Sequence, residues 1–260
     1  MSGRFAVVVA HPDDDTFACA GTVALHADDP GFRFVLVHAT SGEAGQIAEG
    51  SRATRETLGP IREEEDRRSW ITLGREPDRH EWLRYPDHRL EEVPFGELVD
   101  RIAAILAEER PDVVLTFGPD GITGHPDHLV IGRATTEAFH RVRVDGGPGL
   151  RRLLYTVIPQ TTIDAWNRSM VEAGQEPFDP TELYHPRGVP DELVGVDVDT
   201  SPVAGRVLEA LREHRTQADD MPDWSDEEQL ASLAHERCVI AWPERAPGDP
   251  VLRDVFEGVG

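Results

Sequence analysis

Phe5-Ala-Val-Val-Val-Ala-His-Pro-Asp-Asp14 is the stretch of sequence that decides the fold. It opens with an unbroken apolar run, which is typical of a strand covered on both faces, and it ends in an imidazole and carboxylates. The chain repeats this construction, because the apolar run Val113-Val-Leu-Thr-Phe117 is followed a few residues later by His125-Pro-Asp-His128. Parallel strands deliver their C-terminal ends to one edge of a sheet, where ligands bind. We therefore expect the two polar stretches to meet at that edge.

Outward from these runs, strands alternate with helices as far as residue 158. Apolar runs indicate the strands, and apolar residues at a helical period with suitable end residues indicate the helices. This alternation predicts an α/β fold with a mostly parallel sheet covered by helices. The expected strands are residues 4–10, 32–38, 79–85, 112–117 and 153–158, and the expected helices are residues 16–27, 60–73, 95–109 and 127–141.

The C-terminal part of the chain is less regular. Residues 159–195 are rich in the turn-formers Pro and Gly, so we expect a long insertion over the site or an edge hairpin. We expect a single domain over residues 1–260, in which 1–158 is the catalytic α/β core and 159–260 is an irregular substrate-side extension with closing elements. These closing elements are strands at 194–198 and 239–242, a helix at 202–213, and a helix at 225–235 that opens on a capping box of Ser225 and Glu228.

Composition disfavours several classes of protein. The formal net charge is −23, so nucleic-acid binding is disfavoured, and the absence of lysine excludes Schiff-base chemistry on a lysine. No apolar run approaches the roughly 18 residues that a membrane span needs, so no membrane partner is expected. Cys19 and Cys238 make no disulfide framework, and the chain opens on a strand without a signal segment. A cytoplasmic protein is therefore expected.

The two polar stretches together match a catalytic metal site. Such a site has three protein ligands and one open position for water. His11 and Asp14 are close together across a tight turn, and His128 can supply the third ligand. Zinc fits this set of ligands, and a mixed nitrogen and oxygen site also accepts iron(II) or cobalt(II).

Three further residues of these stretches are expected beside the metal. Asp13 is placed to take a proton from a water that the metal has activated. His125, when protonated, can stabilise an oxyanion or protonate a leaving nitrogen. Asp127 can fix the orientation of an imidazole through a hydrogen bond. Together these residue types predict a metal-dependent hydrolase.

Several of the candidate residues also have a structural interpretation. Aspartates after a strand are often helix caps, although this explanation requires both polar stretches to be incidental. Arg62 either binds a substrate or pairs in solvent with Glu65 or Asp66 on the same helix face. Asp87 follows a proline and either binds a substrate or is a turn residue. His214 either reaches the site or caps a helix end.

The remaining histidines and aromatic residues carry less information. Histidines without a clear partner in the sequence, among them His38, His80 and His88, are interpreted as surface or core residues. Three aromatic residues of the irregular stretch either line the site or form a small core of their own: Trp166, Phe178 and Tyr184.

Five motifs occur in an order that resembles a known family. They are His11-Pro-Asp-Asp, Thr40-Ser-Gly-Glu-Ala-Gly45, Arg62-x-x-Glu65 ahead of Leu73-Gly74, Tyr85-Pro-Asp87 and His125-Pro-Asp-His128, with a weaker echo in His214-Arg-Thr-Gln217. From residue 5 to about residue 140 the chain resembles the LmbE-like, PIG-L-like zinc-dependent N-deacetylases. That family includes enzymes that remove acetyl from N-acetylglucosamine groups, mycothiol-conjugate amidases and antibiotic-tailoring deacetylases.

The resemblance implies a fold and a set of roles. It implies a Rossmann-like fold with zinc on His11, Asp14 and His128. It further implies that Asp13 is the general base and that His125 faces the oxyanion. Two other residues are similar to positions that hold the sugar or its substituent in the family: Arg62 and Asp87.

The chain departs from the family pattern at two positions. Asp15 stands where the family usually has glutamate, and Thr123 stands where the mycothiol deacetylase carries a tyrosine that assists the reaction. The second departure weakens an assignment to that particular enzyme.

The expected function is removal of an acetyl group from a small N-acetylglucosamine-like amino sugar by a metal-activated water. A mycothiol-conjugate amidase or a natural-product N-deacylase is the alternative, and an inert metal-holding protein is the least favoured interpretation. A homo-oligomer is compatible with the sequence.

Overall fold

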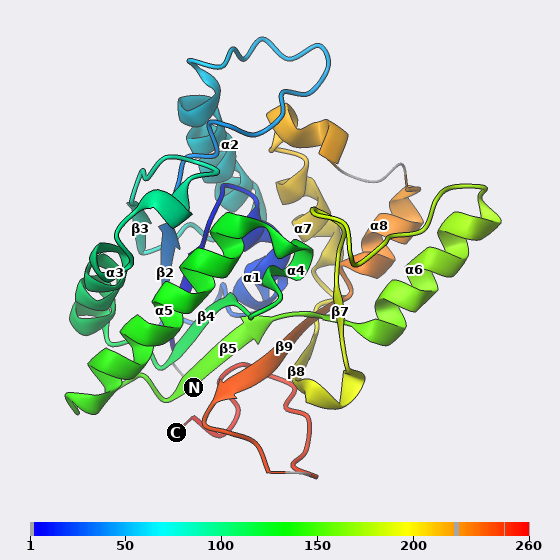
Figure 1. Ribbon diagram of the computed structural model, residues 1–260. Helices are drawn as coiled ribbons and strands as arrows, with labels where there is room; N and C mark the ends of the chain where they lie inside the picture. Colours follow the sequence, from blue (N-terminus) through cyan, green and yellow to red (C-terminus); the bar gives the residue numbers. More distant parts are fainter. Residues whose placement is uncertain (1–2, 221–223, 247, 260) are drawn as a thin grey trace.

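The computed structural model describes residues 3–220, 224–246 and 248–259. Within these residues, seven strands form one central sheet (Figure 1). In spatial order they are β3 (Arg79–Trp82), β2 (Arg33–His38), β1 (Arg4–Val9), β4 (Val113–Phe117), β5 (Arg152–Thr156), β9 (His235–Trp242) and β8 (Val194–Asp199).

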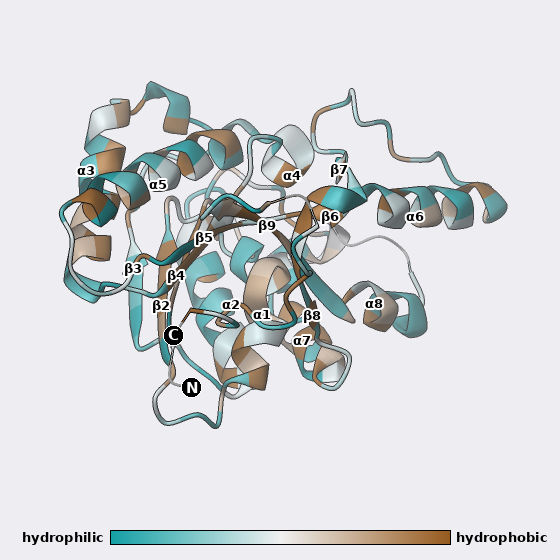
Figure 2. Cartoon of the chain, turned by 90° about the horizontal axis from the view of Figure 1, so that it is seen from below, coloured by the Kyte–Doolittle hydropathy of each residue, from teal (hydrophilic) through white to brown (hydrophobic). Residues whose placement is uncertain are grey.

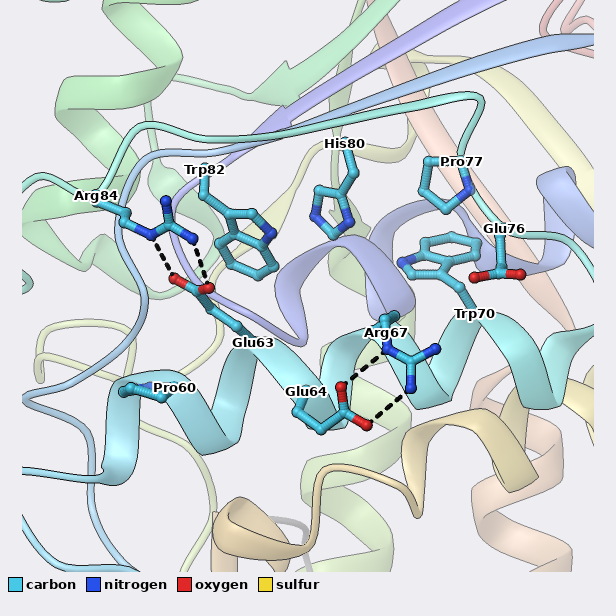
Figure 3. Close-up of a pocket in the computed structure, with 10 residues that line it drawn as sticks. All are labelled: Pro60, Glu63, Glu64, Arg67, Trp70, Glu76, Pro77, His80, Trp82 and Arg84. Carbon is cyan, nitrogen blue, oxygen red and sulfur yellow. Dashed lines mark hydrogen bonds and ion pairs between the residues drawn. The ribbon is translucent and has the colours of Figure 1, made fainter.

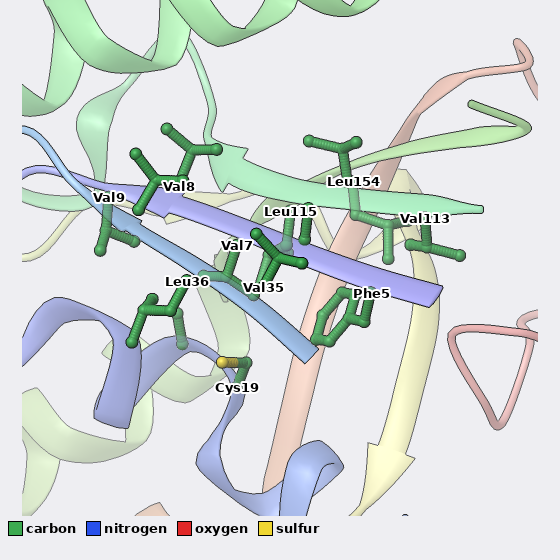
Figure 4. Packing of buried hydrophobic residues seen from close by; sticks show 14 of the residues in the cluster. Phe5, Val7, Val8, Val9, Cys19, Val35, Leu36, Val113, Leu115 and Leu154 are labelled. Carbon is green, nitrogen blue, oxygen red and sulfur yellow. The ribbon is translucent and has the colours of Figure 1, made fainter. Parts of the chain in front are cut away.

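The sheet is mostly parallel, which confirms the expected fold class. From β3 to β5 each strand runs parallel to its neighbour, and β9 alone runs antiparallel to both strands beside it. β1 lies between β2 and β4, and its residues from Phe5 to Val9 are buried. Figure 4 shows their side chains packed with Leu36 and Leu115 in the core. Burial on both faces explains why this stretch is an unbroken apolar run.

Helices cover both faces of the sheet (Figure 2). On one face α3 (Phe95–Glu109) and α5 (Pro126–Val144) pack against each other. On the other face α1 (Asp14–Leu25), α2 (Leu58–Leu73) and α7 (Ala204–Leu211) pack together. No helix among the described residues is long and apolar enough to cross a membrane.

The irregular stretch contains a helix that the sequence analysis missed. α6 (Gln160–Glu172) projects from the body of the molecule in both views, and Ile163 is its one buried residue. Ile163, Trp166 and Met170 of this helix do recur at a helical period, but they stand in a stretch rich in Pro and Gly, and no helix was expected there. The alternative prediction of an edge hairpin is also wrong. A hairpin consists of antiparallel strands, whereas β6 (Ile158–Pro159) and β7 (Gly188–Val189) pair in parallel.

The closing elements differ from expectation mainly at their ends. The helix from Ser225 is the shorter α8 (Asp226–Ser232), and its capping box with Glu228 is present. The last strand begins at His235 and not at residue 239. Three 3-10 turns complete the described structure: η1 (Leu90–Glu92), η2 (Asp191–Leu193) and η3 (Arg215–Asp220).

The order of the strands determines where loops gather. From β1 the chain passes to β2 on one side, whereas β4 and β5 lie on the other side. The loops after β1 and β4 therefore leave adjacent strands at the point where the strand order reverses. The first of these loops carries His11, and the second leads through the short α4 (Gly121–Gly124) to His125.

Candidate metal centre and active site

The loop after β1 turns sharply into α1. The backbone N–H of His11 donates to Asp14 Oδ2 at 2.7 Å, which closes the loop on itself. Asp13 precedes the helix with φ of 112°, a conformation that is strained for a residue with a side chain. Such strain persists where the surrounding structure over-determines it, and sites of chemistry are common examples. The loop therefore fixes the directions of the His11, Asp13 and Asp14 side chains.

The start of α5 supplies the other half of the site. His125 is the N-cap, and its Nδ1 accepts a hydrogen bond from the N–H of Asp127 at 3.1 Å. Pro126 occupies the first helical position, where a missing N–H does no harm. One turn into the helix, Nδ1–H of His128 donates to the carbonyl oxygen of Gly121 at 3.0 Å. The helix start thus fixes the orientation of both imidazoles.

Donor atoms of three side chains from the two loops meet. His11 Nδ1 lies 3.3 Å from Asp14 Oδ2 and 3.3 Å from His128 Nε2, and His128 Nε2 lies 3.2 Å from Asp14 Oδ1. Metal–ligand bonds of about 2.0–2.1 Å at tetrahedral angles place ligand atoms roughly 3.3 Å apart. The two imidazole nitrogens and the Asp14 carboxylate therefore fit one small divalent cation.

The second ring nitrogens show that the fit is chemical as well as geometric. Since Nδ1 of His128 donates to Gly121, its Nε2 carries a lone pair toward the other two donors. His11 Nε2 points the other way, at 3.1 Å from Asp87 Oδ1 and 3.5 Å from Asp127 Oδ2. A proton on that nitrogen leaves Nδ1 free to bind a metal, which is the usual carboxylate–histidine–metal arrangement.

His125 also reaches the cluster, because one nitrogen of its ring lies within 4.8 Å of ligand atoms of His11 and His128. Burial lowers the pKa of His125 to about 3, and the two neighbouring histidines act in the same direction. The ring is therefore neutral, and with Nδ1 accepting from Asp127 its proton sits on Nε2. A neutral N–H donor is an alternative to the protonated ring considered in the sequence analysis.

Arg62 is buried and lies against the general-base candidate. Its guanidinium donates to Asp13 Oδ2 at 2.9 Å and to two backbone carbonyls, of Pro12 at 2.7 Å and of Gly42 at 3.0 Å. The interpretation of Arg62 as a solvent-exposed partner of Glu65 or Asp66 is therefore wrong. Burial raises the pKa of Asp13 to about 7, and the charge of Arg62 opposes that rise.

Asp87 and Asp127 are buried behind His11. Asp87 Oδ2 accepts from the N–H of Ala44 at 2.8 Å, and Asp127 accepts from the N–H groups of His88 and Leu90 at 2.7 and 3.1 Å. Burial works to raise the pKa of Asp87, but the contact with His11 outweighs it and the pKa is lowered. Both carboxylates therefore contact the His11 ring and also accept hydrogen bonds from the backbone of the loops that contain Ala44 and His88.

Two further aromatic side chains lie near the site: His88, which was expected at the surface or in the core, and Tyr184, for which lining the site was one of two interpretations. The His88 ring lies 4.7 Å from that of His125, and the Tyr184 ring lies 5.3 Å from it between centroids. Tyr184 reaches this position because its N–H donates to the carbonyl of Thr123 at 3.1 Å. His88 had one usable signal, since it directly follows the Tyr85-Pro-Asp87 motif.

The other open residues lie elsewhere. His214 is buried and its Nε2 lies 3.2 Å from Thr16 Oγ1, so it supports the start of α1 from behind. Trp166 packs against Trp224, and Phe178 packs against His185. His214, Trp166 and Phe178 thus have their ring and hydrogen-bond partners outside the group formed by His11, Asp14 and His128.

Comparison with known proteins gives consistent matches. The model of the family "PIG-L: GlcNAc-PI de-N-acetylase" matches residues 6–139. The 1D-myo-inositol 2-acetamido-2-deoxy-alpha-D-glucopyranoside deacetylase of Tsukamurella paurometabola is 30% identical over 100% of both chains.

Two solved structures resemble the fold at low identity. N,N'-diacetylchitobiose deacetylase of Pyrococcus horikoshii has a TM-score of 0.60 at 22% identity and covers 95% of this chain and 84% of its own. The 4-carboxy-2-hydroxymuconate hydratase GalB of Pseudomonas putida has a TM-score of 0.63 at 16% identity, over 94% of this chain and 98% of its own.

Proposed function

The chain belongs to the PIG-L family of GlcNAc-PI de-N-acetylases, and from this premise we propose that it hydrolyses the acetamide of a 2-acetamido sugar. The products are acetate and the free amino sugar. The observation that carries the proposal is the group of three side chains, His11, Asp14 and His128, whose donor atoms lie 3.2–3.3 Å from one another, with the carboxylate of Asp13 between the first two in the chain.

We propose that zinc is the ion, held by His11, Asp14 and His128. Two imidazoles and one carboxylate are a common catalytic donor set for zinc. A divalent ion at this position supplies Lewis acidity, which polarises the acetamide carbonyl and lowers the pKa of water.

The residues of the chain divide the remaining work. Asp13 accepts a proton from the attacking water. The oxygen of that water adds to the acetyl carbon, and the carbonyl oxygen takes up negative charge. The Nε2–H of His125 donates a hydrogen bond to that oxygen. When the C–N bond breaks, Asp13 returns its proton to the leaving nitrogen. Arg62 holds Asp13 in place and favours its ionised form.

The proposed substrate is an N-acetylglucosamine unit joined to a polyol such as inositol. The relatives of Tsukamurella paurometabola and Actinosynnema mirum, which are deacetylases of such a glucoside, support this proposal. Thr123 lies where the resemblance to the mycothiol deacetylase leads one to expect tyrosine, but Tyr184 is hydrogen-bonded to its backbone. An aromatic hydroxyl is therefore available beside His125 from another part of the chain.

The test is an assay of acetate release from a panel of acylated amines. The panel contains the inositol glucoside, free N-acetylglucosamine, N,N'-diacetylchitobiose and an acetylated thiol conjugate. We expect hydrolysis of the inositol glucoside above the others, loss of activity with a chelator, and recovery with zinc. Asp13→Asn is expected to keep its metal and to lose about two to four orders of magnitude in turnover.

Two results contradict the proposal in different ways. Cleavage of the thiol conjugate alone identifies an amidase with the same site. Retention of metal without hydrolysis of any acylated amine identifies a binding protein.

A further inference from the structure

A second group of metal-ligand side chains lies outside the site described above. It consists of His38 at the end of β2, Asp66 in α2 and His80 in β3, and one ligand atom from each lies within 4.8 Å of the others. None of the three belongs to the set that holds the first ion or to the proposed mechanism. Asp15 separates the two groups, because it follows Asp14 in the chain and its Oδ1 lies 3.1 Å from His38 Nε2.

The distances within this second group suit a cation. His38 Nδ1 lies 3.0 Å from His80 Nε2, and His80 Nε2 lies 3.6 Å from Asp66 Oδ2. The separation expected for two ligands of one tetrahedral zinc ion, roughly 3.3 Å, falls between these values. The contact between His38 Nε2 and Asp15 fixes the first imidazole through its other nitrogen, as is usual for a metal-bound histidine.

The buried carboxylate of Asp66 is the strongest indication that this group binds an ion. Its relative exposure is 0%, and neither of its carboxylate oxygens has a hydrogen-bond partner. A buried carboxylate without partners is costly, so it must be neutralised by a proton or by a cation. His80 Nε2 lies 3.6 Å from Asp66 Oδ2, and His38 Nε2, the nitrogen that faces Asp15, lies 3.8 Å from Asp66 Oδ1. A divalent cation bound by His80 Nε2, by the other nitrogen of His38 and by an oxygen of Asp66 would neutralise this carboxylate.

An ion can reach this group from solvent. A pocket of about 430 Å³ lies against α2 and β3, and His80 lines it together with Trp70, Trp82 and Pro77 (Figure 3). The rim carries the carboxylates of Glu63 and Glu64, each paired with an arginine, and that of Glu76. His80 is thus the one ligand of the three that lines the described pocket, whereas His38 and Asp66 lie behind it.

We propose that His38, Asp66 and His80 form a second site for a divalent first-row transition ion such as zinc, cobalt(II) or nickel(II). Two imidazoles and one carboxylate select such ions over magnesium and calcium, which prefer oxygen ligands. The ion would link β2, β3 and α2 through one ligand from each. Because His38 contacts Asp15, it would also fix the position of Asp15, which follows Asp14 of the first site. This inference does not depend on the proposed function.

The experiment uses the full chain, stripped of metal and titrated with zinc or cobalt(II). We expect two equivalents per chain for the wild type and one for His11→Ala, His80→Ala and Asp66→Asn. The double variant His11→Ala/His80→Ala is expected to bind none. His235→Ala removes an imidazole at the start of β9 that pairs with Asp197 of β8, so it is expected to keep two equivalents.

The metal stoichiometries of the variants distinguish a filled second site from an empty one. The proposal is overturned if His80→Ala binds as many equivalents as the wild type, or if His11→Ala and the double variant bind the same amount. His80 is partly exposed, so its replacement is expected to leave the fold intact by circular dichroism, and Asp66→Asn preserves shape as a second check. With cobalt(II), His11→Ala should still give the visible absorption of a low-symmetry site, and the double variant should not. None of these readouts uses hydrolysis, so failure of the proposed deacetylation leaves them standing.

Discussion

The contrast between His11 and His125 shows how single hydrogen bonds assign chemistry to similar side chains. Both imidazoles lie in the same cluster, yet different nitrogens are engaged. His11 turns Nε2 toward Asp87 and Asp127 and leaves Nδ1 for a metal, whereas His125 has Nδ1 engaged by a backbone N–H. The first is therefore suited to bind a cation, and the second to donate a hydrogen bond from Nε2.

Arg62 controls the proton affinity of Asp13, and this gives a prediction about pH. The guanidinium lowers the pKa of Asp13, which must be ionised to accept a proton from water. Arg62→Gln is therefore expected to raise that pKa and to move the acidic limb of the kcat/KM profile to higher pH, by about 1–3 units. The measurement is the pH dependence of acetate release at fixed metal concentration.

A matched control is available on the same helix. Arg67 lies on α2 with an exposed side chain that pairs with Glu64, so Arg67→Gln should leave the profile unchanged. An acidic limb that stays in place or moves to lower pH in Arg62→Gln would falsify the role given to this arginine.

Residue types and spacing in the sequence were enough to nominate His11, Asp14 and His128, and the structure brings these three together. Their roles stay predictions. The sequence did not indicate His88 and left two interpretations open for Tyr184, because each reaches the site through tertiary contacts: His88 through Asp127, and Tyr184 through the backbone of Thr123. It also left His38 and His80 without partners, since their contact joins separate strands.

The packing of α5 on β4 positions His128, one of the three proposed metal ligands. Gly132 lets the helix approach closely, because a Cβ at this position would lie 2.5 Å from the carbonyl oxygen of Phe117. The Phe117 ring in turn stacks on the His128 imidazole at 4.0 Å. A shift of α5 away from the end of β4 therefore moves His128 relative to His11.

A substitution at this contact tests the argument. Gly132→Ala is expected to destabilise the protein by about 1–3 kcal/mol, because backbone on both sides must give way. It should also weaken zinc binding at the first site. The measurements are urea denaturation of the metal-free chain and zinc titration.

Gly205 is the matched control, since it lies within α7 and nothing stands within 4 Å of a Cβ built there. Gly205→Ala should be neutral or slightly stabilising, because alanine favours a helix. Equal stability and equal zinc affinity of Gly132→Ala and the wild type would contradict the close seating of α5.

Buried strands were predictable because apolar runs report burial on two faces, and β1, β2 and β4 are all of this kind. α6 was not predicted, although Ile163, Trp166 and Met170 recur at a helical period, because the surrounding Pro and Gly residues favoured an irregular segment. Strand ends were also imprecise, as for β9, whose first residues are polar and pair with β8. That pairing spans distant parts of the chain and has no local signal.

At the scale of the whole molecule, the fold places a site at the C-terminal ends of its strands, and proteins with different reactions share this fold. The fold is shared with a deacetylase and, at a similar TM-score, with a hydratase, so the sheet and its helices do not determine the reaction. What is specific is the meeting of two distant loops at the point where strand order reverses. The account therefore depends on which atoms the two loops present to a cation.

The most direct test is a crystal structure of the zinc-loaded protein with anomalous diffraction measured at the zinc edge. The account predicts an anomalous peak about 2.0–2.3 Å from His11 Nδ1, the Asp14 carboxylate and His128 Nε2. An ion bound instead to His11 Nε2 with Asp87 and Asp127, the other cluster around this ring, would contradict it. So would the absence of any peak between the two loops.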